Sequence, residues 1–201
     1  MTTVSGLFDT YDDALSAANR LQSLGIDRAN ISVMANNADG TRIDSSGRAS
    51  EAGEDAAMGV GVGAAVGGAG GLLAGLGVLA IPGIGPVVAA GWLAATAAGA
   101  VAGAVAGGAV GGVVGAMTSE GVPENEANVY AEGVRRGGTL VSARVDDDRA
   151  AEAQAILHSD GAADVSDRER TYREEGWTRF NPDSPAYTAD EVTRERDRYS
   201  V

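Results

Sequence analysis

The sequence predicts an α+β fold, a ferredoxin-like βαββαβ sandwich that is split between its second and third strands by a long glycine-rich helical hairpin. Segments with strand periodicity and segments with helix periodicity alternate on both sides of the centre of the chain. Between them, residues 56–119 contain no Asp, Glu, Lys or Arg. Within this uncharged run, glycine recurs at every fourth position in two blocks, which is the spacing of one face of a helix.

The first half of the sandwich is expected in residues 1–35. Residues 3–8 are short and apolar, as in a strand, and Asp9 or Thr10 can cap the helix that follows. Alanines and leucines then recur at helical spacing, and residues 31–35 have the composition of a second strand. Together these segments predict a βαβ unit.

An insertion follows, made of an expected flexible linker in residues 36–55 and a glycine-zipper helical hairpin in residues 56–119. The linker is rich in Asn, Asp, Ser, Gly and Ala and has almost no large apolar side chain to bury. We expect one arm of the hairpin at about residues 58–80 and the other at about residues 87–117. Glycines four residues apart leave a ridge without side chains, against which another helix can lie closely.

The two glycine blocks of the hairpin are separated by a segment that predicts a tight turn, because proline stops a helix and glycine permits a reversal. The residues expected in this turn are Pro82, Gly83, Gly85 and Pro86. The glycines expected at the helix-packing interface are Gly59, Gly63, Gly67, Gly71, Gly75, Gly91, Gly99, Gly103, Gly107, Gly111 and Gly115. This interface predicts a homo-oligomer.

The length of the arms predicts that the hairpin crosses the cytoplasmic membrane, with the folded domain facing the cytosol. Both arms exceed the roughly 20 residues that a helix needs to span a bilayer. Two features leave an alternative open, a cytoplasmic oligomer in which the ridges are buried between hairpins. The flanks of the hairpin are acidic, with Glu51 and Glu54 on one side and Glu120 and Glu124 on the other, and the arms are mostly Ala and Gly.

The second half of the sandwich is expected in residues 120–166. Pro123 opens a helix that stops at a pair of glycines, and residues 139–145 are the clearest strand in the chain. The aspartates of residues 146–148 can cap another helix, and residues 163–165 are expected to form the last strand.

Composition excludes several function classes. The chain has 28 Asp and Glu against 15 Arg and no Lys, for a net charge of −13, so a nucleic-acid partner would be repelled. It contains no Cys, which excludes disulfides and thiolate metal sites. The first residues lack the basic region and apolar core of a signal peptide, so a cytosolic start is expected.

Candidate chemistry is sparse, and we expect no enzyme, no cofactor and no metal site. His158 is the single histidine and is expected near the end of a helix, where its ring meets the helix dipole. The aspartates of residues 146–148 lack the further ligands of a calcium loop and are better explained as helix caps. Residues 61–67 only echo a dinucleotide-binding loop, because the glycine spacing is wrong and no strand precedes them. The sequence does not identify a small-molecule ligand.

Residues 167–201 read as a charged tail that carries well-spaced aromatic residues. Trp177 and Phe180 are candidates for docking a partner protein, or they pack against the sheet or helices of their own chain. The prolines of residues 181–185 forbid a continuous helix through the tail.

Four stretches resemble bacterial heat-induced, general-stress-protein domains of the YflT-like type. They are residues 5–14, residues 31–33, the turn at residues 81–86 and residues 121–141, and the resemblance covers about residues 3–166. It implies induction under stress and association with a membrane, and it carries over no catalytic residue.

Two function hypotheses follow from these observations. The first is a non-enzymatic stress-associated protein, anchored in the membrane and self-associating through the glycine-zipper hairpin. The second is a soluble, oligomeric sensor that binds a small ligand at an edge of the sheet and uses the hairpin as an oligomerisation stalk.

Overall fold

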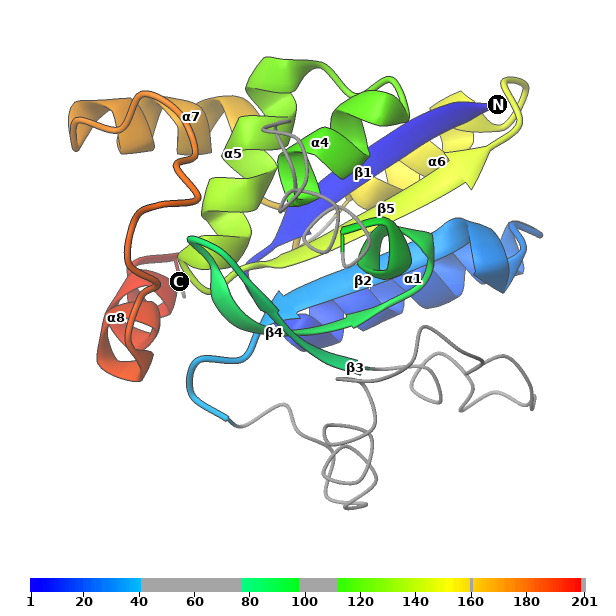
Figure 1. Ribbon diagram of the computed structural model, residues 1–201. Coiled ribbons are helices and arrows are strands. Elements are labelled where there is room, and N and C mark those ends of the chain that lie inside the picture. Colours follow the sequence, from blue (N-terminus) through cyan, green and yellow to red (C-terminus); the bar gives the residue numbers. More distant parts are fainter. Residues whose placement is uncertain (41–76, 98–111, 160, 200–201) are drawn as a thin grey trace.

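A computed structural model of the chain describes residues 1–40, 77–97, 112–159 and 161–199 (Figure 1). It confirms an α+β protein in which helices pack against one antiparallel sheet. The strands are β1 (Thr2–Phe8), β2 (Ile31–Asn36), β3 (Gly77–Ile81), β4 (Gly85–Ala90) and β5 (Thr139–Val145). The helices are α1 (Tyr11–Ser23), α4 (Val113–Ser119), α5 (Glu124–Arg135), α6 (Ala150–Leu157), α7 (Val165–Glu174) and α8 (Ala189–Tyr199), with a 3₁₀ turn at Arg28–Asn30 and helical residues at 92–97.

The five strands lie in the order β1-β5-β2-β4-β3, and every neighbouring pair is antiparallel. Strand β5 lies between β1 and β2, although α1 joins those two strands directly in the sequence. Ser142 of β5 lies opposite Ser5 on one side and Ser32 on the other, which fixes the register of the three strands. The two halves of the chain therefore share one sheet, as the sequence predicts.

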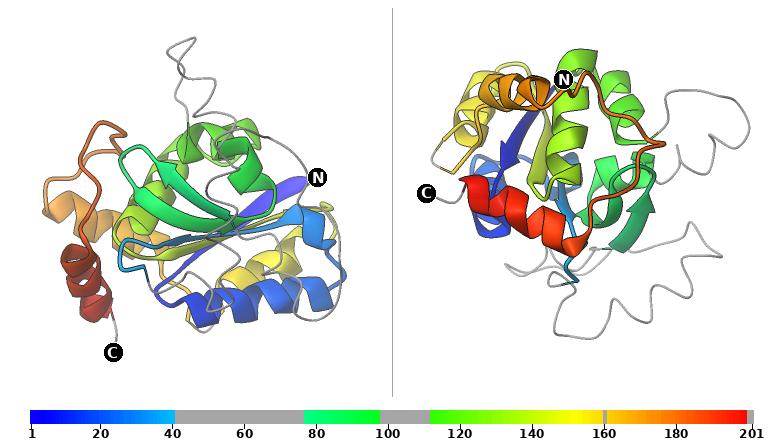
Figure 2. Two further views of the ribbon diagram at one scale, coloured as in Figure 1. Left: turned by 60° about the horizontal axis from the view of Figure 1, so that its bottom comes forward. Right: turned by 90° about the vertical axis from the view of Figure 1, so that its left-hand side faces the viewer.

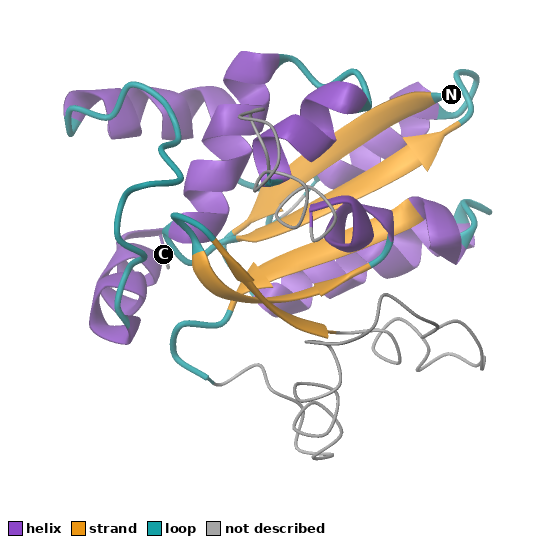
Figure 3. Cartoon of the chain, in the orientation of Figure 1, coloured by secondary structure: helices purple, strands orange, loops and turns teal. Residues whose placement is uncertain are grey.

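Helices cover both faces of this sheet (Figures 2 and 3). Val141 packs in a core with α1 and α6, whereas the neighbouring Leu140 packs in a second core with α4, α5 and residues 92–97. The predicted sandwich has helices on one face only, so that prediction was wrong for the second face. The reason lies in β5, which is buried on both faces, with Leu140 and Ser142 on one face and Val141 and Ala143 on the other.

The predicted helical hairpin is wrong around its turn, because residues 77–81 and 85–90 form a β-hairpin, whereas residues 92–97 and 113–119 of the predicted second arm are helical. Val78 of β3 lies opposite Val88 of β4. The predicted turn residues do form a turn, but between strands: Gly83 and Gly85 have φ of 77° and 95°, which glycine adopts without strain. The β-branched residues at the start of β4 favour a strand over a helix.

The glycine ridge is interrupted in the same region. Gly91 follows the last residue of β4 with a φ of 88°, so it lies on no helix face, while Gly115 lies in α4. The other predicted interface glycines lie outside the described residues. In the ranges that the structure describes, every helix is too short or too polar to span a bilayer, so the predicted transmembrane anchor is wrong there.

The predicted charged tail contains α7 and α8, which pack against the C-terminal end of α5 (Figure 1). Arg136 follows α5 and is buried beside them; its Nε donates to Glu132 at 2.8 Å, and Nη1 donates to Glu175 and, at 3.4 Å, to Glu195. The Arg136 guanidinium also lies 4.1 Å from the centre of the Tyr172 ring. This charged cluster joins three helices that are distant in the sequence.

Acid should loosen the attachment of α8 through Glu175. Burial alone would raise the pKa of Glu175, but hydrogen bonds from Arg136 and Arg198 hold that pKa below its usual value. A carboxylate with a lowered pKa in the folded state stabilises the fold above its unfolded pKa of about 4.3, and this contribution is lost as the pH falls below it.

We therefore expect the wild-type chain to lose more stability than Glu175→Gln when urea unfolding is measured from about pH 6 down to about pH 3. The difference should be small, below about 1 kcal/mol, because Glu175 is more than one-third exposed. Equal losses in the two proteins would contradict a stabilising role for the Glu175 carboxylate.

Candidate functional site

Strand β1 lies at one end of the sheet, and its outer edge is open along most of its length in the described part of the chain. On that side the pairing is a single bridge between Phe8 and Ala162. Next to it, the N–H of Ala163 donates to the carbonyl of Leu7 at 2.8 Å.

The edge is open because the chain leaves the sheet at Asp164. The sequence predicts a strand at residues 163–165, but the Asp164 side chain instead accepts hydrogen bonds from the N–H groups of Ser166 and Asp167, at 2.8 and 3.1 Å. These bonds cap α7, which begins at Val165. The predicted last strand is therefore wrong beyond the bridge, and the rest of the outer edge of β1, opposite β5, has no described strand beside it.

Alternate peptide groups of β1 point away from β5 and toward this open side, as in any antiparallel edge strand. The Leu7 carbonyl accepts from Ala163, and the Ser5 carbonyl accepts from the Tyr130 hydroxyl at 3.1 Å. By the same alternation, the N–H and C=O of Thr3 point this way as well. The edge thus presents hydrogen-bond donors and acceptors in a row.

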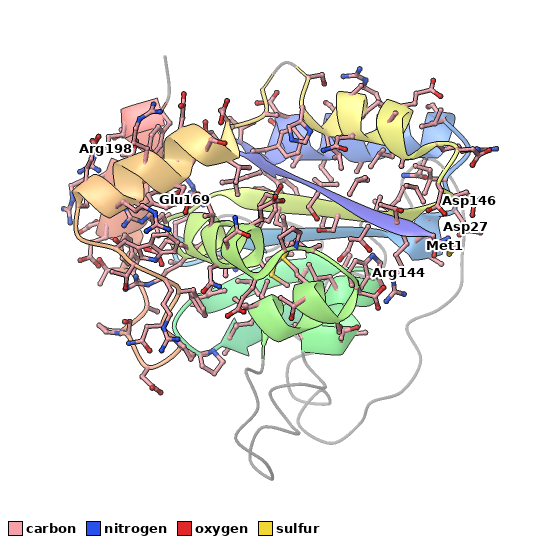
Figure 4. The ribbon with its side chains drawn as sticks, turned by 90° about the horizontal axis from the view of Figure 1, so that it is seen from above. Met1, Asp27, Arg144, Asp146, Glu169 and Arg198 are labelled. Carbon is pink, nitrogen blue, oxygen red and sulfur yellow. The ribbon has the colours of Figure 1, made fainter. Side chains whose placement is uncertain are left out.

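A cleft of about 540 Å³ runs along this row of peptide groups. Residues 2–5 form its base, α5 forms one wall from Pro123 to Tyr130, and Gln154 and His158 at the end of α6 form the other. Figure 4 looks down on this edge and shows β1 crossing between α6 and α5. Met1 lies at the right-hand end of the strand, and Glu169 on α7 lies toward its left-hand end.

The charged groups that line the cleft are mostly acidic. The acidic residues of the lining are Glu126, Asp164 and Glu169, and the lining contains no Arg. Glu169 pairs with Arg173 of its own helix at 2.6 Å, so the negative charge of the cleft comes mainly from Glu126 and Asp164. Burial raises the pKa of the Tyr130 hydroxyl, and the charge of Glu126 raises it further, so the hydroxyl stays protonated and can donate to Ser5. A cleft with this charge attracts cations and repels anions.

His158 and Asp147, which the sequence analysis considered as candidates for chemistry, both make contacts within their own chain. The Nδ1 of His158 lies 2.9 Å from the Gln154 carbonyl oxygen, at the end of α6. Asp147 accepts a hydrogen bond from the Thr2 hydroxyl at 2.7 Å, which lowers its pKa together with contacts from the N-terminal amine. The described residues contain no group of three or more His, Asp or Glu placed to hold a metal ion.

The two aromatic residues proposed for docking pack against their own chain. Phe180 is buried against the turn that contains Gly83, and its N–H donates to Asn128 at 3.1 Å. Trp177 is half-buried, and its ring lies edge-on to Tyr172 with 5.9 Å between the ring centres. Both rings therefore pack against residues of their own chain.

The sequence did not identify the cleft, although one local signal was available. Asp164 is followed three residues later by Asp167, a pattern that marks the start of a helix rather than the continuation of a strand. Glu126 and Tyr130 are four residues apart, which places them on the same face of α5. Nothing in the sequence shows that this face borders β1.

Comparisons of the chain with protein-family models, with curated proteins and with solved structures found no match. The resemblance to bacterial stress-protein domains remains a prediction, carried by the stretches that show it. The cleft and its charge are then the features of the described chain that bear most directly on function.

Proposed function

We propose that this chain is a non-enzymatic binding protein that holds a cationic organic ligand in the cleft along the edge of β1. One observation carries the proposal: the open peptide groups of β1 and the carboxylate of Glu126 border the same cleft. The proposal develops the second hypothesis from the sequence, a ligand-binding sensor whose ligand lies at an edge of the sheet.

We also propose that β1, α1, β2, β5 and α6 form a ferredoxin-like unit whose fourth strand is reduced to the bridge at Ala162. The strand order, in which β5 separates β1 from β2 and Ala162 lies on the other side of β1, supports this assignment. In such a unit the fourth strand covers the outer edge of β1. Its shortness here accounts for the cleft.

The lining suits binding better than catalysis. Glu126 supplies a negative charge on an exposed turn of α5, and the peptide groups of β1 supply oriented hydrogen bonds. Tyr130 is buried, so its hydroxyl fixes the distance between α5 and β1 through Ser5 and keeps the cleft in shape. The ring of His158 is turned toward a backbone carbonyl of its own helix.

Spermidine is a suitable probe for the proposed cation site. We expect it to shift the amide resonances of Thr3 and Ser5 when the full ¹⁵N-labelled chain is titrated at low salt. Glu126→Gln should bind it about two- to fivefold more weakly, because one exposed charge contributes modestly to affinity. Glu152→Gln is the matched control, because Glu152 is exposed on α6 and does not line the cleft. Equal affinity of the two variants, or shifts elsewhere only, would contradict the proposal.

A further inference from the structure

We infer that the ligand is an extended basic peptide that adds to the sheet as a strand alongside β1. This inference rests on the ligand site proposed above and specifies its occupant. It is carried by three features of the cleft: the direction of the β1 peptide groups, the side chains above and below them, and the charge of the lining.

The backbone of β1 already shows how an added strand would pair. The segment at Ala162 and Ala163 runs antiparallel to β1, and the N–H of Ala163 donates to the Leu7 carbonyl at 2.8 Å. The chain then turns away into α7. A peptide that continues in this direction meets the N–H of Ser5, whose carbonyl already accepts from the Tyr130 hydroxyl, and then the N–H and C=O of Thr3. Residues 2–5 extend over about 13 Å at the usual rise of a strand, which suits a peptide of about five residues.

The two faces of the sheet determine which side chains such a peptide needs. In an antiparallel pair, directly opposed residues place their side chains on the same face. Leu7 packs in the core with α5, and Ser5, two residues before it, points to the same face. A peptide residue hydrogen-bonded to Ser5 or Thr3 therefore places its side chain toward α5 and Glu126. The intervening residues point toward Gln154 and His158 on α6, where small polar side chains fit.

The charge of the lining selects basic side chains at the positions that face α5. Glu126 lies on that wall, and Asp164 and Glu169 border the end of the cleft near Ala163. A compact amine can neutralise Glu126 and Asp164, but it cannot also pair with the N–H of Ser5 and with the N–H and C=O of Thr3. An extended peptide does both, which is how strand addition to an open sheet edge is stabilised elsewhere.

The pentapeptide acetyl-Lys-Thr-Lys-Thr-Lys-amide tests this inference on the full chain. Two of its three lysines should pair with Ser5 and Thr3, and the lysines should point toward the α5 wall that carries Glu126, while its threonines should point toward α6. N-methylation of the lysines removes the N–H groups that face β1, whereas N-methylation of the threonines removes N–H groups that face away. We expect the lysine-methylated peptide to bind about tenfold more weakly than the parent, and the threonine-methylated peptide to bind about as well as the parent.

The results of these titrations distinguish a peptide from the other possible occupants of the cleft, a compact amine and a second copy of the chain. Equal binding of the two methylated peptides, with spermidine also binding, would overturn strand addition and leave the proposed cation site in place. If neither spermidine nor any peptide shifts the Thr3 and Ser5 amides, both proposals are wrong. If dilution of the protein alone shifts these amides, a second copy of the chain covers the edge, and the peptide is not its occupant.

Discussion

Arg136→Ala should lower the free energy of unfolding by about 3 kcal/mol, because it removes the buried guanidinium from Glu132 and Glu195, which keep only their contacts with Arg135 and Arg198. The Glu132 side chain is 1 % exposed, and its Oε1 accepts from the Nε of Arg136 at 2.8 Å. Glu195 is buried as well and lies 3.4 Å from the same guanidinium. The ring of Tyr172 stacks on that guanidinium and loses its contact too.

Urea unfolding followed by circular dichroism measures this effect, and Arg170→Ala provides the control. Arg170 also pairs with a carboxylate, Asp167 at 2.7 Å, but both side chains are more than 60 % exposed. Its loss should change stability by less than about 1 kcal/mol. Adding Glu132→Gln to Arg136→Ala should recover part of the loss. A loss as small as that of the control would show that the buried cluster contributes nothing beyond a surface ion pair.

The second large effect is expected for Gly91→Ala, at the residue that follows β4 and lies against the start of β2. A Cβ atom at Gly91 would lie 2.2 Å from the carbonyl oxygen of Ile31 and 2.8 Å from the Cα of Ser32. Both are backbone atoms of the sheet, so they cannot yield without separating the strands. The Ser32 hydroxyl, which donates to the Ala90 carbonyl at 2.7 Å, would lose its partner as the strands part.

We expect Gly91→Ala to cost about 3 kcal/mol or more in thermal or urea unfolding, since overpacking adds to the strain of a positive φ. Gly121→Ala isolates the strain, because Gly121 has the same φ of 88° and a Cβ there would meet nothing within 4 Å. That variant should cost about 1–2 kcal/mol. Similar losses in the two variants would mean that the contact with β2 is unimportant.

The parts of the fold that the sequence predicted well are those that local chemistry determines. Thr10 caps α1 by accepting from the N–H of Asp13 at 3.1 Å, and α5 begins directly after Pro123. Strand β5 was recognisable from its run of apolar and β-branched residues. In each case the signal lies within a few residues of the element it specifies.

The elements that were mispredicted depend on partners far along the chain. β4 is a strand because it pairs with β2, where Ala35 lies opposite Val88, and a glycine period of four in the sequence does not show that pairing. The cleft depends on Asp164, which caps α7 directly after the bridge at Ala162. Its position relative to α5 and α6 follows from the sheet order, which a single sequence does not contain.

The central position of β5 in the sheet affects how the chain folds during synthesis as well as its final structure. During synthesis β1 and β2 are complete long before β5 leaves the ribosome, yet neither strand touches the other, because β5 separates them. The edges of β1 and β2 that pair with β5 stay open until about a hundred further residues are made, so these contacts close over long loops and folding is slow. The newly made N-terminal half therefore carries open strand edges until β5 is synthesised and inserts between β1 and β2.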